Sequence, residues 1–339
     1  MNKYILGSIV LFTLIVFGGC STDVDMYDDY KDITIVYGIA DIESDTTWIK
    51  ITKAFSGPGN ALVIAGNPDS SNYPYKLDVQ LTGKKLGSDE LPPIVLDTIT
   101  IHNKQTSDFI VNDAGETVDL NPFYGPDQLM YYTTEPLLSD YTYKLQIDNK
   151  GKLIKGETPM ISNFSVSSPP NTITFAPSTN SSIEWRSVKN GKRYEVSLTF
   201  HYKELLPGAS DTTNKSVSWS IGVSKSNSLE GGEEMGITYD GGTFFALLND
   251  PANLPVIPNV QRWAGVVDIH IAAGSQVLHT FLDINGASGS LLEEVPLYTN
   301  LDGGIGIFAS RHNTMRSVRL STSTEEDLIE QDLGFKWAK

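Results

Sequence analysis

The chain has very little cysteine: Cys20 is the only one among 339 residues. A single thiol cannot form a disulfide within the chain, so the fold must depend on buried apolar side chains. Beyond the first twenty residues, no apolar run approaches the roughly 20 residues that a membrane-spanning helix requires. The sequence also lacks the H-E-x-x-H, G-x-G-x-x-G and G-x-x-x-x-G-K-[ST] motifs, so the common zinc, dinucleotide and nucleotide signatures are missing.

Basic residues are scarce as well. Lysine and arginine number 25 against 41 aspartate and glutamate residues, which gives a net charge of −16. Such an acidic surface repels phosphate backbones, so we expect no nucleic-acid partner. The hydrophobic content of 40% is enough for packed cores. The length exceeds what one core usually holds, which favours two domains.

Candidate catalytic and metal-ligating residues do not form recognisable patterns. Residues 286–290 lack the final glycine of a nucleophile elbow. Adjacent glutamates, such as Glu233 and Glu234, are expected by chance in a chain this acidic. We therefore expect no catalytic residues, no metal and no cofactor, and a hydrolase is the less favoured alternative. The histidines are scattered: His102, His201, His270, His279 and His312.

The first twenty residues indicate where in the cell the protein is located. Lys3 supplies a positive charge, residues 4–17 form an apolar run of signal-peptide length, and Gly18 and Gly19 lead into Cys20. This arrangement resembles the lipobox of bacterial lipoproteins, with phenylalanine in place of the usual leucine-like residue. It predicts a signal peptide over 1–19, cleavage between Gly19 and Cys20, and acylation of Cys20 that anchors the chain to a membrane. The alternatives are a secreted protein cut elsewhere and a single-span anchor.

An acidic segment follows the cysteine, over residues 20–32. It resembles the surface-export signal of Bacteroidota lipoproteins, and it is equally suited to be a solvated tether. The aspartates do not have EF-hand spacing, because the central glycine and terminal glutamate are missing. They are Asp23, Asp25, Asp28, Asp29 and Asp32.

Residues 33–159 alternate with period two, which is typical of strands with one face on a core. In the first of these strands Ile33, Ile35 and Tyr37 alternate with other residues, so we expect that apolar set to face the core. Short strands separated by glycine- and proline-containing turns predict an immunoglobulin-like β-sandwich domain. Its terminal hairpin is expected over 141–147 and 153–158. The other expected strands are 48–52, 77–81 and 98–101.

Residues 160–339 are expected to form a second, α+β domain that is mostly antiparallel. Its clearest strand is 194–202, where five alternate apolar or aromatic residues share one face. Helices are expected over 243–248, over 276–283 with Ser275 as N-cap, and from Thr324 onward. Residues 229–242 are expected to form a loop. The other expected strands are 183–188, 217–223, 266–271, 304–309 and 318–320.

Two segments carry a family resemblance. Residues 156–159, at the end of the first domain, and residues 296–308, with Asn300, paired glycines and Phe308, resemble a large family of uncharacterised Bacteroidota outer-membrane lipoproteins. The resemblance implies an outer-membrane lipoprotein, often associated with TonB-dependent receptors, and brings no established activity or binding residues. Physically, the glycines allow close backbone approach and Phe308 is expected in the core.

The sequence therefore favours a non-enzymatic, lipid-anchored protein of the cell envelope that binds a partner or ligand as an accessory to an outer-membrane TonB-dependent transporter. The alternative is a surface glycan-binding or adhesin module. Whether the body lies on the periplasmic or the surface side stays open. Segments 45–47, 97–99 and 211–213 resemble the Bacteroidota O-glycosylation sequon. Loop tyrosines either stack on sugars or cap the core with their hydroxyls in water; they are Tyr73, Tyr75, Tyr124, Tyr131 and Tyr132.

Overall fold

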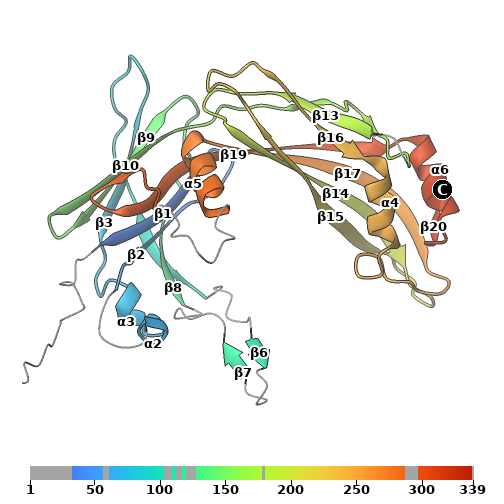
Figure 1. Ribbon diagram of the computed structural model, residues 1–339, viewed down its shortest axis with the longest axis horizontal. Helices are drawn as coiled ribbons and strands as arrows, with labels where there is room; N and C mark the ends of the chain where they lie inside the picture. The colour runs from blue at the N-terminus through green and yellow to red at the C-terminus, as the bar shows by residue number, and fades with distance from the viewer. Residues whose placement is uncertain are drawn as a thin grey trace, which may run out of the picture.

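A computed structural model describes residues 33–55, 61–102, 109–111, 117–119, 127–177, 180–286 and 297–337. The fold is mainly β, with mostly antiparallel sheets, as the sequence predicts. Two lobes meet to form an arch (Figure 1). The predicted signal peptide, Cys20 and the acidic segment 20–32 lie outside the described residues.

One ten-stranded sheet runs through both lobes. Its main path follows the order β15-β14-β17-β19-β1-β2-β8-β5, while β12 pairs with β19 and β20 pairs with β17. In the first lobe its strands are β1 (Thr34–Asp41), β2 (Thr47–Lys53), β5 (Asp97–Ile101) and β8 (Gln128–Thr133). The others are β12 (Thr172–Ile173), β14 (Arg193–Leu205), β15 (Thr213–Lys225), β17 (Gln261–Gly274), β19 (Ile305–Leu320) and β20 (Phe335–Lys336).

Strand β19 belongs to both lobes. Residues 305–311 pair in parallel with β1 of the first lobe, and residues 311–319 pair antiparallel with β17 of the second. The sequence predicted two separate strands here, which is wrong: the intervening residues are polar or charged except Met315, so the apolar alternation is lost while the backbone pairing continues. The expected boundary also placed 301–310 with the second domain, whereas these residues pair with strands of the first lobe.

The first lobe encloses its core between the ten-stranded sheet and a five-stranded sheet of order β18-β10-β9-β3-β4. The predicted hairpin is confirmed as the antiparallel pair β9 and β10. Buried residues in the centre of this core include Val36, Ile49, Leu81, Ile147 and Phe308. The five strands are β3 (Asp78–Lys84), β4 (Ile94–Val95), β9 (Thr142–Asn149), β10 (Lys152–Pro159) and β18 (Leu301–Asp302). The smaller elements are α2 (Ala61–Ala65), α3 (Pro68–Ser71), β6 (Phe109–Val111) and β7 (Thr117–Asp119).

The side chains of β1 face the core and the solvent in the opposite sense to the prediction. Thr34, Val36 and Gly38 face the core, and Tyr37 is 48% exposed. Glycine in the core position makes room, because a Cβ on Gly38 would lie 3.1 Å from the Phe308 ring. The apolar set of this strand therefore lies on the outer face of the lobe.

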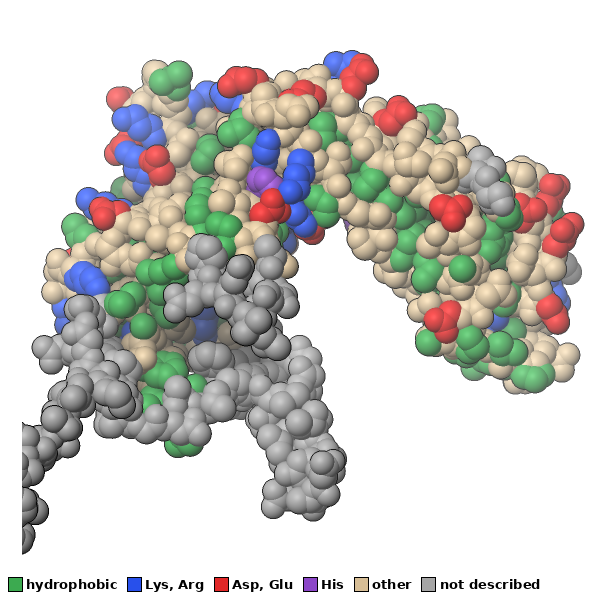
Figure 2. Space-filling model, viewed as in Figure 1, with side chains coloured by type: hydrophobic (Ala, Val, Ile, Leu, Met, Phe, Trp, Pro, Cys, Tyr) green, Lys and Arg blue, Asp and Glu red, His purple; other side chains and the backbone are tan. Residues whose placement is uncertain are grey.

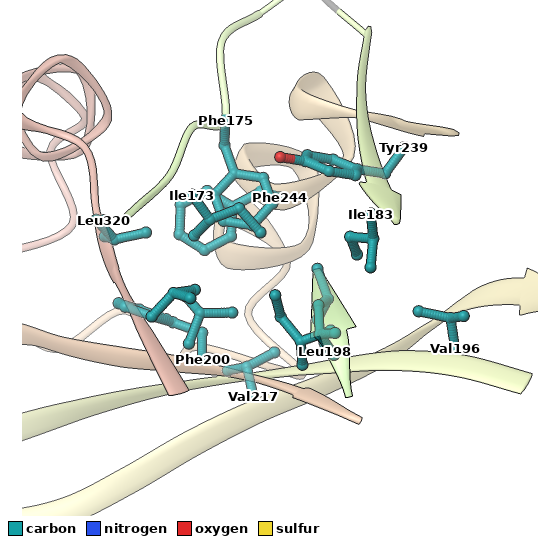
Figure 3. Packing of buried hydrophobic residues seen from close by; sticks show 14 of the residues in the cluster. Ile173, Phe175, Ile183, Val196, Leu198, Phe200, Val217, Tyr239, Phe244 and Leu320 are labelled. Carbon is teal, nitrogen blue, oxygen red and sulfur yellow. The ribbon is translucent and has the colours of Figure 1, made fainter. Parts of the chain in front are cut away.

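The second lobe packs the other half of the ten-stranded sheet against a small sheet and two helices. The predicted alternation of β14 is confirmed, with Tyr194, Val196, Leu198, Phe200 and Tyr202 all buried on one face. Figure 3 shows Phe200, Phe175 and Phe244 converging in this core, and the Phe175 and Phe244 rings stack with centroids 4.4 Å apart. The small sheet consists of β11 (Val166–Ser168), β13 (Asn180–Arg186) and β16 (Glu234–Asp240), and the helices are α4 (Gly241–Asn249) and α6 (Thr322–Glu330).

The expected helices are present, with some changes at their ends. Helix α4 begins after the N-cap Asp240, and the preceding strand β16 occupies much of the segment expected as a loop. Helix α6 is capped by Ser321, whose hydroxyl accepts from the amide of Thr324. The hydroxyl of Thr324 is instead buried, where it accepts from the amide of Phe175 at 2.8 Å. The prediction that Thr324 begins the helix is therefore wrong by two residues.

Helix α5 (Gln276–Gly286) lies on the outer face of β19 at the junction between the lobes. Leu278 packs there with Ile307 and Ala309. Ser275 precedes the helix, and its hydroxyl accepts from the amide of Ser310 at 3.3 Å.

The closing signature 296–308 acts as a structural clasp. The Asn300 side chain accepts from the amide of Phe308 at 2.9 Å and donates to its carbonyl at 2.8 Å. A Cβ on Gly306 would lie 2.0 Å from the Val36 carbonyl oxygen, and a Cβ on Gly303 would lie 2.4 Å from that of Leu153. The predictions of close backbone approach and of a buried Phe308 are both confirmed. Packing alone therefore accounts for this motif.

Candidate functional site

The outer face of the first-lobe sheet is apolar and aromatic. We call it the aromatic face and define it by Tyr37, Ile39, Trp48, Ile99 and Tyr132. Strand pairing places Ile39, Trp48 and Tyr132 in one row across β1, β2 and β8. Trp48 is 39% exposed and Ile99 is 43% exposed. Because these side chains stand on a rigid sheet, they form a fixed surface rather than a mobile loop.

The row ends in a charged group. The rings of Trp48 and Tyr132 lie side by side with centroids 5.4 Å apart and planes inclined by 31°. Asp97 is opposite Tyr132 on β5. Its carboxylate accepts from the amide of Thr98 at 2.7 Å and from Lys76 Nζ at 3.0 Å, and these two bonds lower the pKa of Asp97. A pair of aromatic rings therefore adjoins a hydrogen-bonding carboxylate.

Two neighbouring features extend this surface. Tyr37 contacts Phe281 of α5 edge-on, with ring centroids 6.1 Å apart. A shallow, mostly apolar pocket of about 450 Å³ lies beside Tyr37 and is also lined by Ile35, Phe55 and Gln128. Figure 2 shows hydrophobic side chains reaching the surface of both lobes between clusters of charged ones. The aromatic face is thus continuous with a depression that can accept an apolar group.

The structure separates the predicted loop tyrosines into two kinds. The hydroxyl of buried Tyr131 accepts from the amide of Leu77 at 2.9 Å. The hydroxyl of Tyr73 bonds Thr34 Oγ1, and that of Tyr75 donates to the Asn149 side chain. The hydroxyls of these three are bonded within the lobe, while Tyr132 belongs to the aromatic face. Tyr124 lies outside the described residues.

Sequence reasoning missed the two residues that accompany Tyr132. Trp48 shares the phase of Lys50 and Thr52 in its strand, so an aromatic side chain in a polar phase was the available signal. Tyr37 was assigned to the core because its strand is more apolar on the outer face than on the inner one.

The outer face of the second-lobe sheet is polar. The side chain of His201 is 42% exposed on this face, and its Nε2 lies 2.8 Å from Asp268 Oδ2. Ser317 Oγ donates to the other oxygen of Asp268 at 2.5 Å. Because the serine bonds the carboxylate and not the imidazole, these side chains are not arranged to activate a nucleophile. His270 lines a shallow hollow of about 530 Å³ on the same face, next to Glu43 of the first lobe.

Two histidines lie near the junction of the lobes, where His312 is buried and His279 is half-buried. His312, on β19, packs edge-on against Phe164, and burial lowers its pKa. His279, on α5, lies 3.5 Å from the Asp283 carboxylate, and burial lowers its pKa too. The Nδ1 atom of each ring has no hydrogen-bond partner within the described part of the chain. Burial is thus the main influence on the pKa of both rings.

Among the residues that the structure describes, no group of three or more His, Cys, Asp or Glu side chains is placed to hold a metal ion. Likewise, none of the described helices is long and apolar enough to cross a bilayer.

Comparisons with known proteins give little. No family model matches the chain, and no curated protein matches it. Among solved structures, a chain of a cytokine receptor complex is 10% identical, with 85% of this chain and 98% of that chain covered and a TM-score of 0.19. The FN1–FN3 domains of chicken CNTN1 are 12% identical, with 72% of this chain and 62% of that chain covered and a TM-score of 0.20. At these TM-scores neither structure bears on the fold or function of this chain.

Proposed function

We propose that this chain is a non-enzymatic, lipid-anchored protein of the cell envelope that binds a partner through the aromatic face. The anchor is acylated Cys20 at an outer membrane, and the partner is a TonB-dependent transporter to which the chain is an accessory. The first lobe serves as an immunoglobulin-like sandwich that presents this face, and the second lobe is an α+β domain.

The observation that carries the proposal is the exposure of Trp48, Tyr37 and Ile99 on one sheet face of an acidic protein. Exposed aromatic clusters on a rigid support are typical of interaction surfaces, where a few such residues supply most of the binding free energy. The lipobox-like sequence ending at Cys20 supports attachment to a membrane of the cell envelope. The resemblance of 296–308 to outer-membrane lipoproteins supports the choice of partner.

The test is co-purification of the full chain with its transporter after gentle detergent extraction. Trp48→Ala should weaken capture by about 30-fold, the equivalent of the ~2 kcal/mol that defines a binding hot spot. Trp337→Ala is the matched control, because Trp337 is 49% exposed and directly follows β20, which lies at the far end of the second lobe (Figure 1). If Trp48→Ala and Trp337→Ala capture the transporter equally well, the aromatic face is not the binding surface. If the Cys20→Ala variant stays in the membrane fraction, Cys20 is not the membrane anchor.

A second function, glycan binding, is favoured by the Trp48–Tyr132 pair. Two neighbouring rings of similar tilt match the apolar face of a sugar, and the Asp97 carboxylate can accept from its hydroxyls. A glycan array probed with the native chain and with Tyr132→Ala distinguishes the two functions. Binding that is lost in the variant supports the glycan function. If the native chain binds no glycan on the array, the protein partner is favoured.

A further inference from the structure

Strand β15 is an open edge of the ten-stranded sheet. It is 13 residues long and pairs with β14 along one side, and no strand in the described part of the chain pairs with its other side. At such an edge the N–H and C=O groups of alternate residues point outward without a ladder partner. A long edge of this kind is a template for another extended chain.

The edge carries little protection. Between Lys215 and Lys225, residues 216–224 contain no charge and no proline, the two devices that usually block edge pairing. A register shift against β14 near Gly222 limits the regular part of the strand. The opposite end of the sheet differs, because β5 has only five residues and begins with Asp97.

The side chains of β15 also favour extension of the sheet. On the inner side Val217 is buried, while Trp219 and Ile221 are half-buried against the core. On the outer side Ser216, Ser218 and Ser220 are exposed. A strand with the same alternation would cover the open side of Trp219 and continue the polar outer face.

We propose that β15 pairs with β15 of a second copy of this chain, antiparallel and related by a two-fold axis at Ser218. In this register Val217 faces Trp219 of the second copy, and Ser216 faces its Ser220. Lys225, whose Nζ donates to Asp283 of its own chain at 2.7 Å, is then level with the hairpin loop that carries Asp211 of the second copy. A lysine therefore lies beside an acidic residue of the other copy at both ends. A register centred at residue 220 would set Lys215 against Lys225.

Charge also selects this surface for self-association. The chain carries a net charge of −16, so two copies repel each other in most orientations. Strand β15 contains no acidic residue. Pairing here therefore brings two copies together without opposing their carboxylates, and the ladder supplies a specific geometry.

Disulfide trapping tests the pairing in the full-length chain extracted in mild detergent. Because Cys20 is the only natural cysteine, Ser218→Cys introduces one new thiol at the two-fold axis. Opposed residues of an antiparallel pair have Cα atoms about 4.5–5.5 Å apart, within the range that a disulfide spans. Mild oxidation should convert most of Ser218→Cys to a covalent dimer on a non-reducing gel. Light scattering should give the uncrosslinked native chain twice its monomer mass.

Ser224→Cys is the matched control on the same strand. Its thiol would lie about 40 Å from its copy, at ~3.3 Å for each of twelve intervening positions, so it should remain monomeric on the gel. The native chain without added thiols sets the background from Cys20. A monomeric mass for the native chain, or equal crosslinking of Ser218→Cys and Ser224→Cys, would overturn the proposal. A dimer that Ser218→Cys fails to trap would also overturn it, since its axis lies elsewhere.

Discussion

Replacing Arg262 with methionine should strongly destabilise the second lobe. Arg262 is 1% exposed and Glu204 is 5% exposed, and the Arg262 Nε donates to Glu204 Oε2 at 2.9 Å. The guanidinium also donates to the carbonyl of Leu333 at 2.6 Å and to that of Pro255 at 2.7 Å. Methionine fills a similar volume, but it leaves a buried carboxylate without its counter-charge and two carbonyls without their donors.

Breaking a buried ion pair from one side costs about 3–5 kcal/mol. For a lobe of this size each kcal/mol lowers the melting temperature by about 2–4 °C, so we expect a loss of about 6–20 °C. Differential scanning calorimetry and urea unfolding give the two quantities independently. The exposed pair Arg186–Glu234, with its Nη2–Oε1 distance of 3.1 Å, is the control, and Arg186→Met should cost less than about 1 kcal/mol.

A double variant separates the charge effect from the lost packing and hydrogen bonds. Glu204→Leu combined with Arg262→Met removes the uncompensated carboxylate, so it should be more stable than Arg262→Met alone by about 2 kcal/mol. The carbonyls of Leu333 and Pro255 stay without donors, so recovery is incomplete. If the double variant is no more stable than the single one, the buried charge is not the source of the loss and the reasoning fails.

Three further predictions concern the first lobe and the junction. Gly306→Ala should cost several kcal/mol in urea unfolding, because its Cβ would lie 2.0 Å from the Val36 carbonyl oxygen and its φ is +105°; an unchanged midpoint would contradict the clasp. Tyr131→Phe should cost about 1 kcal/mol in the same assay, since the amide of Leu77 loses its acceptor. Burial lowers the pKa of His312 below its ordinary value of 6.5, so the unfolded chain binds the proton more readily than the folded one. Stability should therefore fall as the pH drops below about 6.5, and His312→Phe should flatten that fall in pH-dependent unfolding measurements.

Sequence pattern was sufficient where one face of a strand meets the core and the other meets water. Strand β14 satisfies this condition, with Phe200 and its alternate neighbours inside and polar residues outside. The hairpin of β9 and β10 was also predictable, because its two strands are joined by a short turn with Lys150 and Gly151 at positive φ. Local chemistry determined both features.

The alternation of residues in the sequence did not predict the structure where both faces of a strand are apolar, or where contacts join distant parts of the chain. Tyr37 faces outward on a strand whose inner positions are filled partly by small residues such as Gly38, so hydrophobicity does not mark the core side of β1. Trp48 is an isolated aromatic residue among the polar outward-facing positions of β2. The contact between Arg311 and the buried Asp41 joins residues 270 positions apart, a separation that periodicity cannot encode. The aromatic face depends on the first of these effects, which is why the sequence indicated Tyr132 without its neighbours.

The strand shared by both lobes has a consequence for how the chain reaches its native state. Synthesis proceeds from the amino terminus, yet β1 lacks its parallel neighbour until residues 305–311 have emerged. The sheet of the first lobe therefore stays incomplete while almost the whole of the second lobe is synthesised. A fragment ending at residue 159 would keep its hairpins but would lack Phe308 and Leu301, which share the buried core with Val36 and Ile154. Folding of the first lobe is therefore completed only after the carboxyl-terminal residues have been made. Separate expression of the amino-terminal half should yield aggregates instead of a folded module.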